Sequence, residues 1–513
     1  MTVPTLPETA PFSPAQRAWL NGFFAGLVNS AAAAAGNSNT SITGAAPATA
    51  VPAEDEENFP WHDPAMPMDE RLELAKDKPI ERRMMAAMAQ LDCGACGYVC
   101  KTYSEAIARG EEKNLTLCTP GGKDTSATLK ELVQLGVKVA PTGGGAKPQA
   151  ANAQAASGKH DRKNPFAARL VASKPLNKSG SDKDTRHVIL DLKGSTLSYK
   201  PGDALGVWPE NCQDLVQDIL ELLNASGAED VLAPDGQHTS LREALLRDYV
   251  ITRPNEEVFK FFGQPEAENV AVIDLLRQHG GKTIDAAAFV AALSPLQPRL
   301  YSISSSLLAH PNQVHLTVGV VQYKSAHGTG CKGVASTYLS TGLRPGQKAR
   351  VFVHASAKFA LPASGDTPMI MVGPGTGIAP FRSFLAERGA AGHQGKNWLF
   401  FGDQRQGVDF LYEDEMKSFQ ESGVLTNLTT AFSRDQEKKV YVQHRMLERG
   451  KEIFEWLEQG AHFYVCGDAK RMASDVDNAL KQIVAEHGNM SAEDAATYVA
   501  NLIKTNRYQR DVY

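Results

Sequence analysis

The sequence predicts a multidomain protein with a parallel α/β sheet in its carboxyl-terminal part. Its 513 residues suggest about three domains at the usual domain size. Apolar strand patterns alternate with helical stretches from residue 368 onward, an alternation typical of a parallel sheet. Those strands are expected at residues 369–372, 397–401, 425–432 and 462–466. Two segments rich in small and polar residues, 31–57 and 141–164, read as linkers that divide the rest of the chain.

Composition excludes several classes of protein. The chain carries 53 basic and 58 acidic residues, a net charge of −5, which disfavours a basic nucleic-acid binder. No apolar run approaches the ~20 residues that span a bilayer, and the N-terminus lacks the features of a secretory signal. We therefore expect a cytoplasmic protein without a membrane span.

Helices and strands are also expected before the parallel sheet. Residues 14–28 follow Ser13, a helix N-cap, and present Trp19, Phe23 and Leu27 on one face. This helix is expected to pack on the protein itself, and a partner-docking or membrane-surface helix is the alternative. Strand patterns occur at 187–192, 204–208, 299–304, 314–323 and 349–353, and residues 211–293 look mainly helical.

A glycine-rich turn follows the first strand of the predicted parallel sheet. The segment from Met369 to Arg382 has an apolar strand, the sequence Gly-Pro-Gly-Thr-Gly at 373–377, and Pro380 in the first turn of a helix. Free backbone N–H groups and the helix dipole can bind a pyrophosphate there. The context favours a dinucleotide site over a structural turn.

Five separated motifs carry a resemblance to a known family. They are Arg299-Leu-Tyr-Ser302, Gly333-Val-Ala-Ser336, the turn at 373–377, Tyr464-Val-Cys-Gly-Asp468 and the C-terminal residues 507–513. Residues 165–513 thereby resemble the ferredoxin–NADP reductase superfamily, in the flavoprotein branch that includes sulfite reductase flavoproteins and microsomal cytochrome reductases. The flavodoxin-like FMN domain that normally precedes this unit has no counterpart in the sequence.

The resemblance implies a fold of multidomain α/β plus β-barrel type. An antiparallel FAD-binding barrel with a helical connecting insertion would precede a parallel α/β NADP-binding domain, and a small four-cysteine module would come first. The expected division is an N-terminal helix at 1–30, a linker at 31–60, the module at 61–140, a linker at 141–164, the barrel at 165–365 with its insertion at about 211–293, and the NADPH-binding domain at 366–513.

The FAD residues are expected in two places. Alternation on a strand points Arg299 and Tyr301 to one face, where a guanidinium can hold the flavin pyrophosphate and a phenol can cover the ring. A second anion site is expected at the start of the helix that follows the second motif. The FAD set is Arg299, Tyr301, Ser302, Thr317, Gly333, Val334, Ala335, Ser336 and Tyr513.

The loop after the third strand of the parallel sheet resembles the family's clamp for the adenosine 2′-phosphate, which implies NADPH as the coenzyme. The alternative is a solvated loop in which Arg434 and Lys439 pair with Asp435 and Glu437. The expected coenzyme set is Gly373, Gly375, Thr376, Gly377, Ser433, Arg434, Lys439, Tyr441, Gln443 and Asp468.

Hydride transfer is assigned to three residues by the resemblance. Cys466 ends a strand at the carboxyl edge of the sheet, where ligands bind, although a lone strand cysteine is usually packing. The family places Ser302, Cys466 and Asp511 beside the nicotinamide and flavin N5, where polar groups stabilise developing charge. Tyr513 matches the terminal aromatic that stacks on the flavin and moves for nicotinamide; a frayed tail is the alternative.

Four of the seven cysteines form a cluster, at Cys93, Cys96, Cys100 and Cys118. In a reducing compartment this spacing favours a metal or cluster over disulfides. It resembles a four-cysteine [4Fe-4S] module of membrane electron-transport complexes, with one residue fewer between the second and third cysteines. Structural zinc is the alternative.

The resemblance implies an NADPH-dependent oxidoreductase. Hydride from NADPH would reduce FAD, and single electrons would pass through the [4Fe-4S] cluster to a metalloenzyme, with a sirohaem sulfite reductase as the expected partner. Nitrite or nitrate reductases and haem oxygenases are alternative acceptors. A scaffold that binds nucleotide without turnover is the alternative from another class, and the joint presence of Ser302, Cys466, Asp511 and Tyr513 argues against it.

Overall fold

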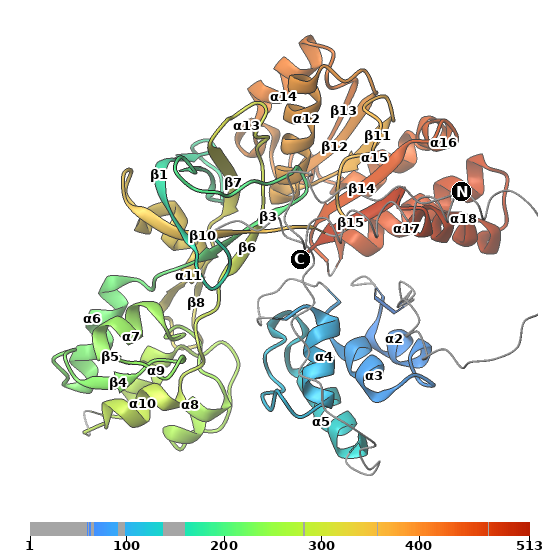
Figure 1. Ribbon diagram of the computed structural model, residues 1–513. Coiled ribbons are helices and arrows are strands. Elements are labelled where there is room, and N and C mark those ends of the chain that lie inside the picture. The colour runs from blue at the N-terminus through green and yellow to red at the C-terminus, as the bar shows by residue number, and fades with distance from the viewer. Residues whose placement is uncertain are drawn as a thin grey trace, which may run out of the picture. The chain divides into compact units, whose positions relative to one another are not determined.

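The computed structural model describes residue 59, residues 61–62, 66–90, 98–136, 160–280, 283–356, 358–469 and 471–513 (Figure 1). The predicted helix at 14–28 and both predicted linkers lie almost wholly outside these residues. Cys93 and Cys96 also lie outside them.

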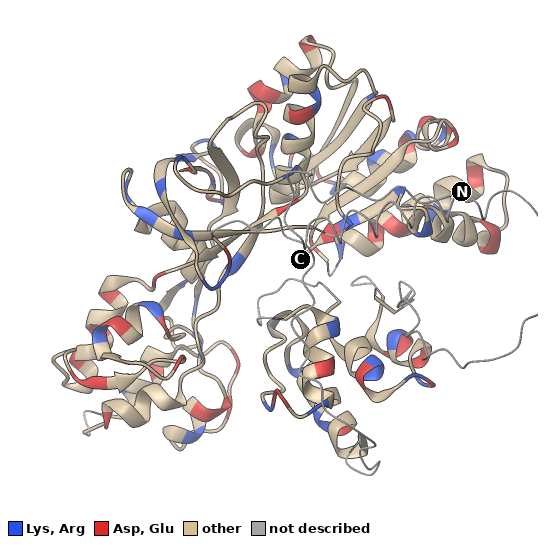
Figure 2. Cartoon of the chain, viewed as in Figure 1, with Lys and Arg blue, Asp and Glu red and all other residues tan. Residues whose placement is uncertain are grey.

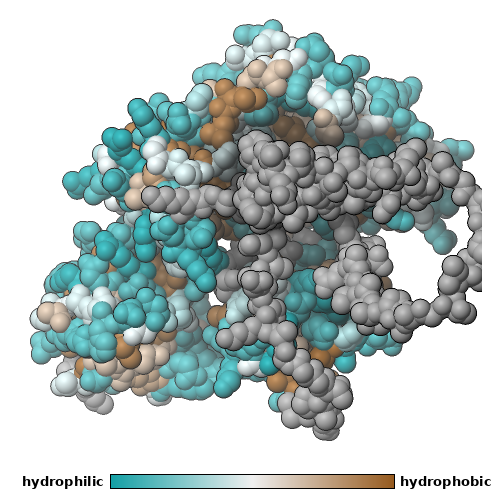
Figure 3. Space-filling model, in the orientation of Figure 1, coloured by the Kyte–Doolittle hydropathy of each residue, from teal (hydrophilic) through white to brown (hydrophobic). Residues whose placement is uncertain are grey.

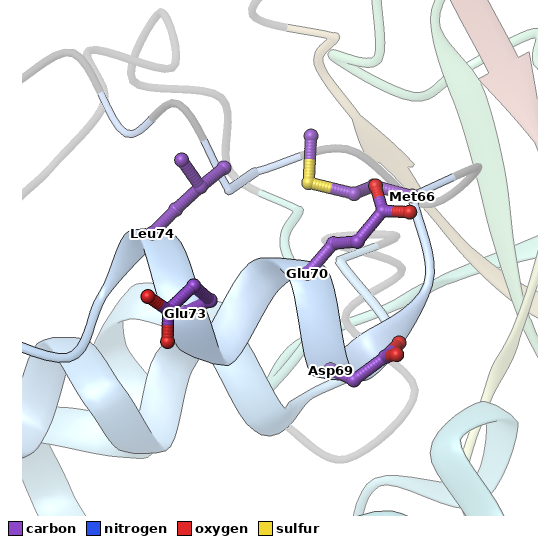
Figure 4. A pocket seen from close by; sticks show the side chains of 5 residues that line it. All are labelled: Met66, Asp69, Glu70, Glu73 and Leu74. Carbon is purple, nitrogen blue, oxygen red and sulfur yellow. The ribbon is translucent and has the colours of Figure 1, made fainter.

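The four-cysteine unit, which we define as residues 61–140, is helical where it is described. Its elements are α2 (Met68–Leu74), α3 (Ile80–Ala87), α4 (Cys100–Ala108), the 3₁₀ turn η1 (Thr119–Gly121) and α5 (Gly122–Gly136). Met84, Met88, Tyr103 and Leu129 form a small apolar core that also holds Cys118. The charged helix α2 lines an open hollow of about 430 Å³ with Met66, Asp69, Glu70, Glu73 and Leu74 (Figure 4).

Six antiparallel strands form the barrel. They are β1 (Phe166–Pro175), β2 (Thr185–Asp191), β3 (Ala204–Trp208), β6 (Arg299–Ser302), β7 (Gln313–Gly319) and β10 (Lys348–His354), in the order β6-β3-β10-β1-β2-β7. A bridge between Ile303 and Leu316 joins the two outer strands, so the sheet closes on itself. Alternating residues such as Leu170, Leu190 and Val207 fill its interior.

The strand predicted at 314–323 is interrupted. β7 ends at Gly319, and a separate hairpin follows, formed by β8 (Gln322–Lys324) and β9 (Gly330–Lys332). The backbone N–H of Val321 leaves the barrel ladder and donates to Ser336 Oγ, in the short helix α11 (Val334–Thr337). The chain continues as a π-helical turn, η2 (Tyr338–Gly342).

The insertion between β3 and β6 is mainly helical, as predicted. Its elements are α6 (Gln213–Leu223), β4 (Asp230–Leu232), β5 (His238–Ser240), α7 (Leu241–Arg247), α8 (Glu256–Phe261), α9 (Val272–Gln278) and α10 (Ala286–Ala292). Ser240, Asn255 and Asp285 accept backbone hydrogen bonds at the starts of α7, α8 and α10. The helices enclose their own apolar core, which includes Ile219, Leu245 and Phe289.

Five parallel strands form the carboxyl-terminal sheet. They are β11 (Met369–Val372), β12 (Asn397–Asp403), β13 (Asn427–Phe432), β14 (His462–Gly467) and β15 (Tyr508–Val512), in the order β13-β12-β11-β14-β15. The strand order reverses between β11 and β14. Ligands bind at such a switch point, at the carboxyl ends of the strands.

Helices cover both faces of this sheet (Figure 1). One face packs against α15 (Val442–Glu448), α16 (Gly450–Glu458), α17 (Met472–His487) and α18 (Ala492–Lys504). The other packs against α12 (Ala379–Ala391) and α14 (Glu413–Glu421), and the 3₁₀ turn η3 (Gly375–Ile378) and short helix α13 (Gln406–Asp409) lie in the loops. Because side chains alternate along a strand, Phe463 and Val465 face the first set of helices, whereas Tyr464 and Cys466 face the second.

Buried polar contacts join the barrel to the parallel sheet. Arg382 of α12 is 4% exposed, donates to the Ser304 carbonyl at 2.6 Å and pairs with Glu415. Ser383 Oγ donates to the Ser305 carbonyl at 2.7 Å. Because these groups would lose hydrogen bonds on separation, they fix the end of β6 against the parallel sheet.

The surface carries charges of both signs, spread over the helices (Figure 2), and the face seen in Figure 3 is mostly hydrophilic where it is described. Among the described residues, no helix is long and apolar enough to cross a membrane.

Candidate functional site

Three polar side chains meet where the parallel sheet contacts the barrel. Cys466 and Asp511 are partners in the β14–β15 register, so they share one face of the sheet. Ser302, at the end of β6, donates from Oγ to Asp511 Oδ2 at 2.7 Å, and the Cys466 thiol lies 3.7 Å from the same oxygen. The fold therefore brings together the three residues to which the sequence assigns hydride transfer. We call them the Ser302–Asp511–Cys466 cluster.

Burial controls the charge of this cluster. Burial raises the pKa of the Cys466 thiol well above its usual value, and the neighbouring Asp511 carboxylate raises it further. Burial also raises the pKa of Asp511, while the hydrogen bond from Ser302 opposes that shift. Cys466 is consequently a neutral thiol at neutral pH, able to donate a hydrogen bond.

The glycine turn packs tightly against this cluster. A Cβ on Gly377 would lie 2.1 Å from the Cys466 carbonyl, and one on Gly373 would lie 2.5 Å from the Gly377 carbonyl. Gly377 therefore allows the turn to approach β14 closely, and Gly373 allows the turn to fold tightly on itself. Gly375 differs, because its surroundings are open but its φ is +58°, which favours glycine.

The C-terminal tyrosine is held at both ends. Its backbone N–H donates to the Gly467 carbonyl at 3.0 Å, and its hydroxyl lies 2.8 Å from Thr376 Oγ1 in the glycine turn. The Tyr513 side chain is nevertheless 54% exposed. An anchored but exposed aromatic ring suits stacking on a planar ligand better than it suits a frayed tail.

The edge strand β6 offers groups suited to a flavin. Among the described residues, Arg299 is exposed and has no ion pair, and Tyr301 has no hydrogen bond from its hydroxyl. Alternation places both on the same face of β6. Burial raises the pKa of Tyr301. An unpaired cation beside an unpaired phenol fits a site for the diphosphate and ring of FAD.

The second predicted FAD motif occupies the loop between β9 and α11. Gly333 is the N-cap of α11, and Val334 and Ala335 follow in its first turn. Ser336 uses its hydroxyl locally, since Oγ accepts from Val321 N and donates to the Gly333 carbonyl. Any contact of this motif with FAD would therefore come from its backbone N–H groups rather than from Ser336 Oγ.

Thr317 contributes to the contact between the barrel and the parallel sheet. It is 5% exposed on β7, and its Oγ1 lies 2.8 Å from the Tyr412 hydroxyl, in the segment before α14. The side chain thus helps join the barrel to the parallel sheet. Its predicted role in FAD binding stays a prediction.

The predicted phosphate clamp lies at the ends of β12 and β13. Arg434 pairs with Asp182 at 3.0 Å. Within the described residues, it does not pair with Asp435 or Glu437, the acids of its own loop that the solvated-loop alternative named. Ser433 follows β13 and contacts the Asp403 carbonyl through its backbone N–H and its hydroxyl. Lys439 and Tyr441 are exposed in the same loop.

Two other predicted coenzyme residues have local partners. Gln443 donates to Asp475 at 3.0 Å. Asp468 accepts from the N–H groups of Arg471 and Met472, so it stabilises the start of α17. Their roles in coenzyme binding stay predictions.

Sequence reasoning missed a carboxylate beside the glycine turn. The side chain of Asp403, at the end of β12, is 1% exposed and pairs with Lys183. Burial raises the pKa of Asp403, whereas Lys183 lowers it. Oδ2 is buried without a hydrogen-bond partner among the described residues, and a Cβ on Gly375 would lie 3.9 Å from it. An orphaned acceptor beside this turn fits a bound coenzyme that supplies hydroxyl donors.

Two of the four clustered cysteines can be placed. Cys100 is the first residue of α4, and Cys118 lies 7% exposed before η1; both pack in the core of the four-cysteine unit. The N–H groups of Gly121 and Gly122 donate to the Cys118 carbonyl, and a Cβ on Gly121 would lie 3.1 Å from Cys118 Sγ. Among the residues that the structure describes, no group of three or more metal-binding side chains occurs.

Comparisons with known proteins define the class. Residues 158–254 and 255–338 match the FAD binding domain family, and residues 371–478 match the oxidoreductase NAD-binding domain family. Together with the barrel and the parallel sheet, these matches make the chain a ferredoxin–NADP reductase-like flavoprotein oxidoreductase.

Relatives that match 68% to 81% of this chain define its family more narrowly than the domain matches do. The sulfite reductase (NADPH) flavoprotein alpha-component of Bacillus subtilis is 44% identical over 443 residues, covering 81% of this chain and 73% of that protein. Its counterparts in Photorhabdus laumondii and Vibrio cholerae are 44% and 45% identical, covering 68% and 70% of this chain and 61% of each relative. The chain belongs to the family of sulfite reductase flavoprotein alpha-components and is an NADPH-dependent oxidoreductase.

Proposed function

We propose that this protein is an electron transferase that accepts hydride from NADPH at FAD and delivers single electrons to a sulfite reductase. The observation that carries the proposal is the Ser302–Asp511–Cys466 cluster, at the carboxyl ends of β14 and β15. The cluster combines a side chain from the barrel with two from the sheet, at the edge where ligands bind. A scaffold that binds nucleotide without turnover has no need of this convergence.

FAD, when bound, supplies the change from a hydride donor to single-electron transfer. The chain's own residues prepare the site for it. Asp511 accepts hydrogen bonds from Ser302 and Cys466, and so it fixes the orientation of both donors. The neutral Cys466 thiol adds a polar group without adding charge. Fixed donors of this kind stabilise charge that develops at a reacting centre.

Tyr513 is proposed to cover the site until the coenzyme enters. Its backbone bonds to Gly467 and Ala469 and its hydroxyl contact with Thr376 place the residue between β14 and the glycine turn, where its ring would limit access of water. Only the Thr376 contact must break for the ring to move, because the other contacts are on the backbone.

Arg299 and Tyr301 are proposed to bind FAD, together with the backbone of the loop at 333–336. Arg434, Lys439 and Ser433 are proposed to bind the 2′-phosphate of NADPH. The exposed cations in this loop support that assignment, because guanidinium and ammonium groups bind phosphate and NADH has no phosphate there.

Cys93, Cys96, Cys100 and Cys118 are proposed to hold a [4Fe-4S] cluster, which would supply the one-electron relay to the acceptor. The placement of Cys100 and Cys118 in one small core supports this assignment. Thiolates within one core are suited to a shared metal centre. Structural zinc is the competing occupant, and metal analysis distinguishes the two.

The partner is proposed to be a sirohaem sulfite reductase. The curated relatives carry sulfite reductase in their names, and the chain covers 61% to 73% of three of them. The test is NADPH oxidation by the purified protein with a sirohaem sulfite reductase and sulfite, compared with nitrite, nitrate and haem acceptors. Oxidation that depends on sulfite supports the proposal. Turnover with one of the other acceptors and none with sulfite would overturn the partner assignment.

A further inference from the structure

One carboxylate contacts two arginines at the carboxyl edge of the parallel sheet. Asp182, between β1 and β2, places Oδ2 3.0 Å from Arg434 Nη1 and 3.1 Å from Arg405 Nη1. Arg434 follows β13, whereas Arg405 follows β12 and begins the turn into α13. A single oxygen from the barrel part of the chain therefore bridges two guanidinium groups of the nucleotide-binding part.

The position of Asp182 is fixed by its neighbours. Ser181 Oγ donates to Asp409, and the Lys183 ammonium pairs with Asp403. Asp403 is the last residue of β12, and Asp409 is the last residue of α13, the short helix that follows β12. Because the residues on either side are held, the loop delivers the Asp182 carboxylate to the arginines, although that side chain is 60% exposed.

The contact has a chemical consequence for coenzyme binding. A carboxylate and a phosphate monoester are both anions that guanidinium groups bind through charged hydrogen bonds. The 2′-phosphate is the part of NADPH that NADH lacks. A phosphate that takes Arg434 must displace Asp182 or share the arginine with it, and the displaced carboxylate still repels the phosphate.

We propose that Asp182 is a specificity-determining residue that competes with the 2′-phosphate for Arg434 and Arg405. It lowers the affinity for NADPH while leaving the affinity for NADH unchanged. The proposal rests on the proposed 2′-phosphate clamp and deepens it, because it adds Arg405 as a second cation and Asp182 as the competing anion. Neither residue belongs to the set predicted from the sequence.

The test compares two neutral variants of neighbouring acids. Asp182→Asn removes the competing charge, and Asp184→Asn is the matched control, because Asp184 pairs with Arg186 instead. Isothermal titration measures binding of adenosine 2′,5′-bisphosphate and of 5′-AMP, which lacks the 2′-phosphate. Exposed ion pairs are weak, so we expect Asp182→Asn to bind the bisphosphate about two- to fivefold more tightly, with 5′-AMP unchanged. The gain should shrink at high salt.

Three results would overturn the inference: no gain with Asp182→Asn, an equal gain for both ligands, or the same gain with Asp184→Asn. Arg434→Ala separates this failure from failure of the clamp itself. If Arg434→Ala weakens binding of the bisphosphate alone while Asp182→Asn changes nothing, the clamp stands and the competition is wrong. If Arg434→Ala affects both ligands equally, the clamp and the competition are both wrong.

Discussion

At the junction of the barrel and the parallel sheet, strand pairing positions the side chains that we propose for hydride transfer. Cys466 and Asp511 are neighbours in the β14–β15 register, and Ser302 lies at the end of a strand of the closed barrel. In the four-cysteine unit, short helices surround a small core, and the described thiols are part of that core. A unit of this size rarely gains enough stability from its core alone, so a bound metal would contribute to folding.

The two sites therefore obtain their geometry in different ways. The Ser302–Asp511–Cys466 cluster is complete from protein contacts alone, and it should persist when a cofactor is removed. The four-cysteine unit should depend on a bound metal or cluster, because Cys100 and Cys118, two of its four proposed ligands, lie in its apolar core. Substitutions at the two sites should therefore have separable effects, one on flavin reduction and the other on electron delivery.

The largest expected effect comes from the four-cysteine unit. Cys118→Ser should abolish electron delivery to the physiological acceptor, because one ligand of the proposed cluster is lost, and Cys96→Ser should do the same. Reduction of FAD by NADPH should stay unchanged. Both reactions are measured separately, by stopped-flow absorbance and by acceptor turnover. Cys212→Ser is the control, because this exposed thiol lies outside the unit. Normal electron delivery by both Cys118→Ser and Cys96→Ser would show that these cysteines do not form an electron relay.

The next effect separates hydride transfer from cofactor binding. Asp511→Ala should slow flavin reduction about 10²- to 10³-fold, because the Ser302 and Cys466 donors are no longer held in place. Cys466→Ala should slow it too, because the thiol donor itself is lost. Bound FAD, measured by the ratio of visible to ultraviolet absorbance, should not change. Lys504→Ala, at the exposed end of α18, is the control. Unchanged rates in both variants would return Cys466 to a packing role.

A smaller effect concerns the choice of coenzyme. Arg434→Ala should raise the Michaelis constant for NADPH about 10- to 100-fold, because a charged hydrogen bond to the 2′-phosphate is lost. The constant for NADH should change little. Arg445→Ala, whose side chain pairs with Glu448 on α15, is the control. An equal loss with both coenzymes would contradict the clamp.

The last effect concerns stability rather than activity, and it is the pH dependence of the junction. Burial, together with Arg382, lowers the pKa of His187 to about 3 and that of His315 to about 2. In the unfolded chain the two histidines bind protons near pH 6.5, whereas in the folded protein they stay neutral. The stability that depends on the neutral histidines is therefore present above pH 6.5 and is lost as the pH falls toward 3. Each histidine should lower the free energy of unfolding by about 1.4 kcal/mol for every pH unit that the pH falls within this window.

Other groups at the junction share this environment. Lys174 and His310 also lower the pKa of His187, and the rings of His187 and Tyr412 are in contact. Urea unfolding at pH 7 and pH 5 measures the slope, and His315→Gln should flatten it. An equal slope in the variant would show that other groups control the acid sensitivity.

The sequence predicts most strands of the two sheets because their apolar residues alternate or run continuously. β3 and β11 occupy the predicted residues, and β12 and β14 extend theirs slightly. β15 is different: Gln509, Arg510 and Asp511 are polar, and no local pattern marks them as a strand. Pairing with β14 at the sheet edge makes this segment a strand, and that pairing brings Asp511 to the cluster.

The candidate site also depends on tertiary packing that local sequence patterns do not show. Motifs identify Ser302, Cys466 and Asp511 individually, but only the closed barrel and the sheet order place them together. Asp182 and Arg405 have no motif, since their importance depends on a contact between residues more than 200 positions apart. Such contacts come from tertiary packing, which local pattern does not encode.

An anaerobic reductive titration counts the electrons that the chain accepts, and it therefore tests whether a hydride-accepting flavin is joined to a one-electron centre. FAD accepts two electrons and a [4Fe-4S] cluster accepts one more, so we expect about three electrons per chain by visible absorbance. Cys118→Ser should accept about two. A native chain that saturates at two electrons, with bound zinc and no acid-labile sulfide, would contradict the account.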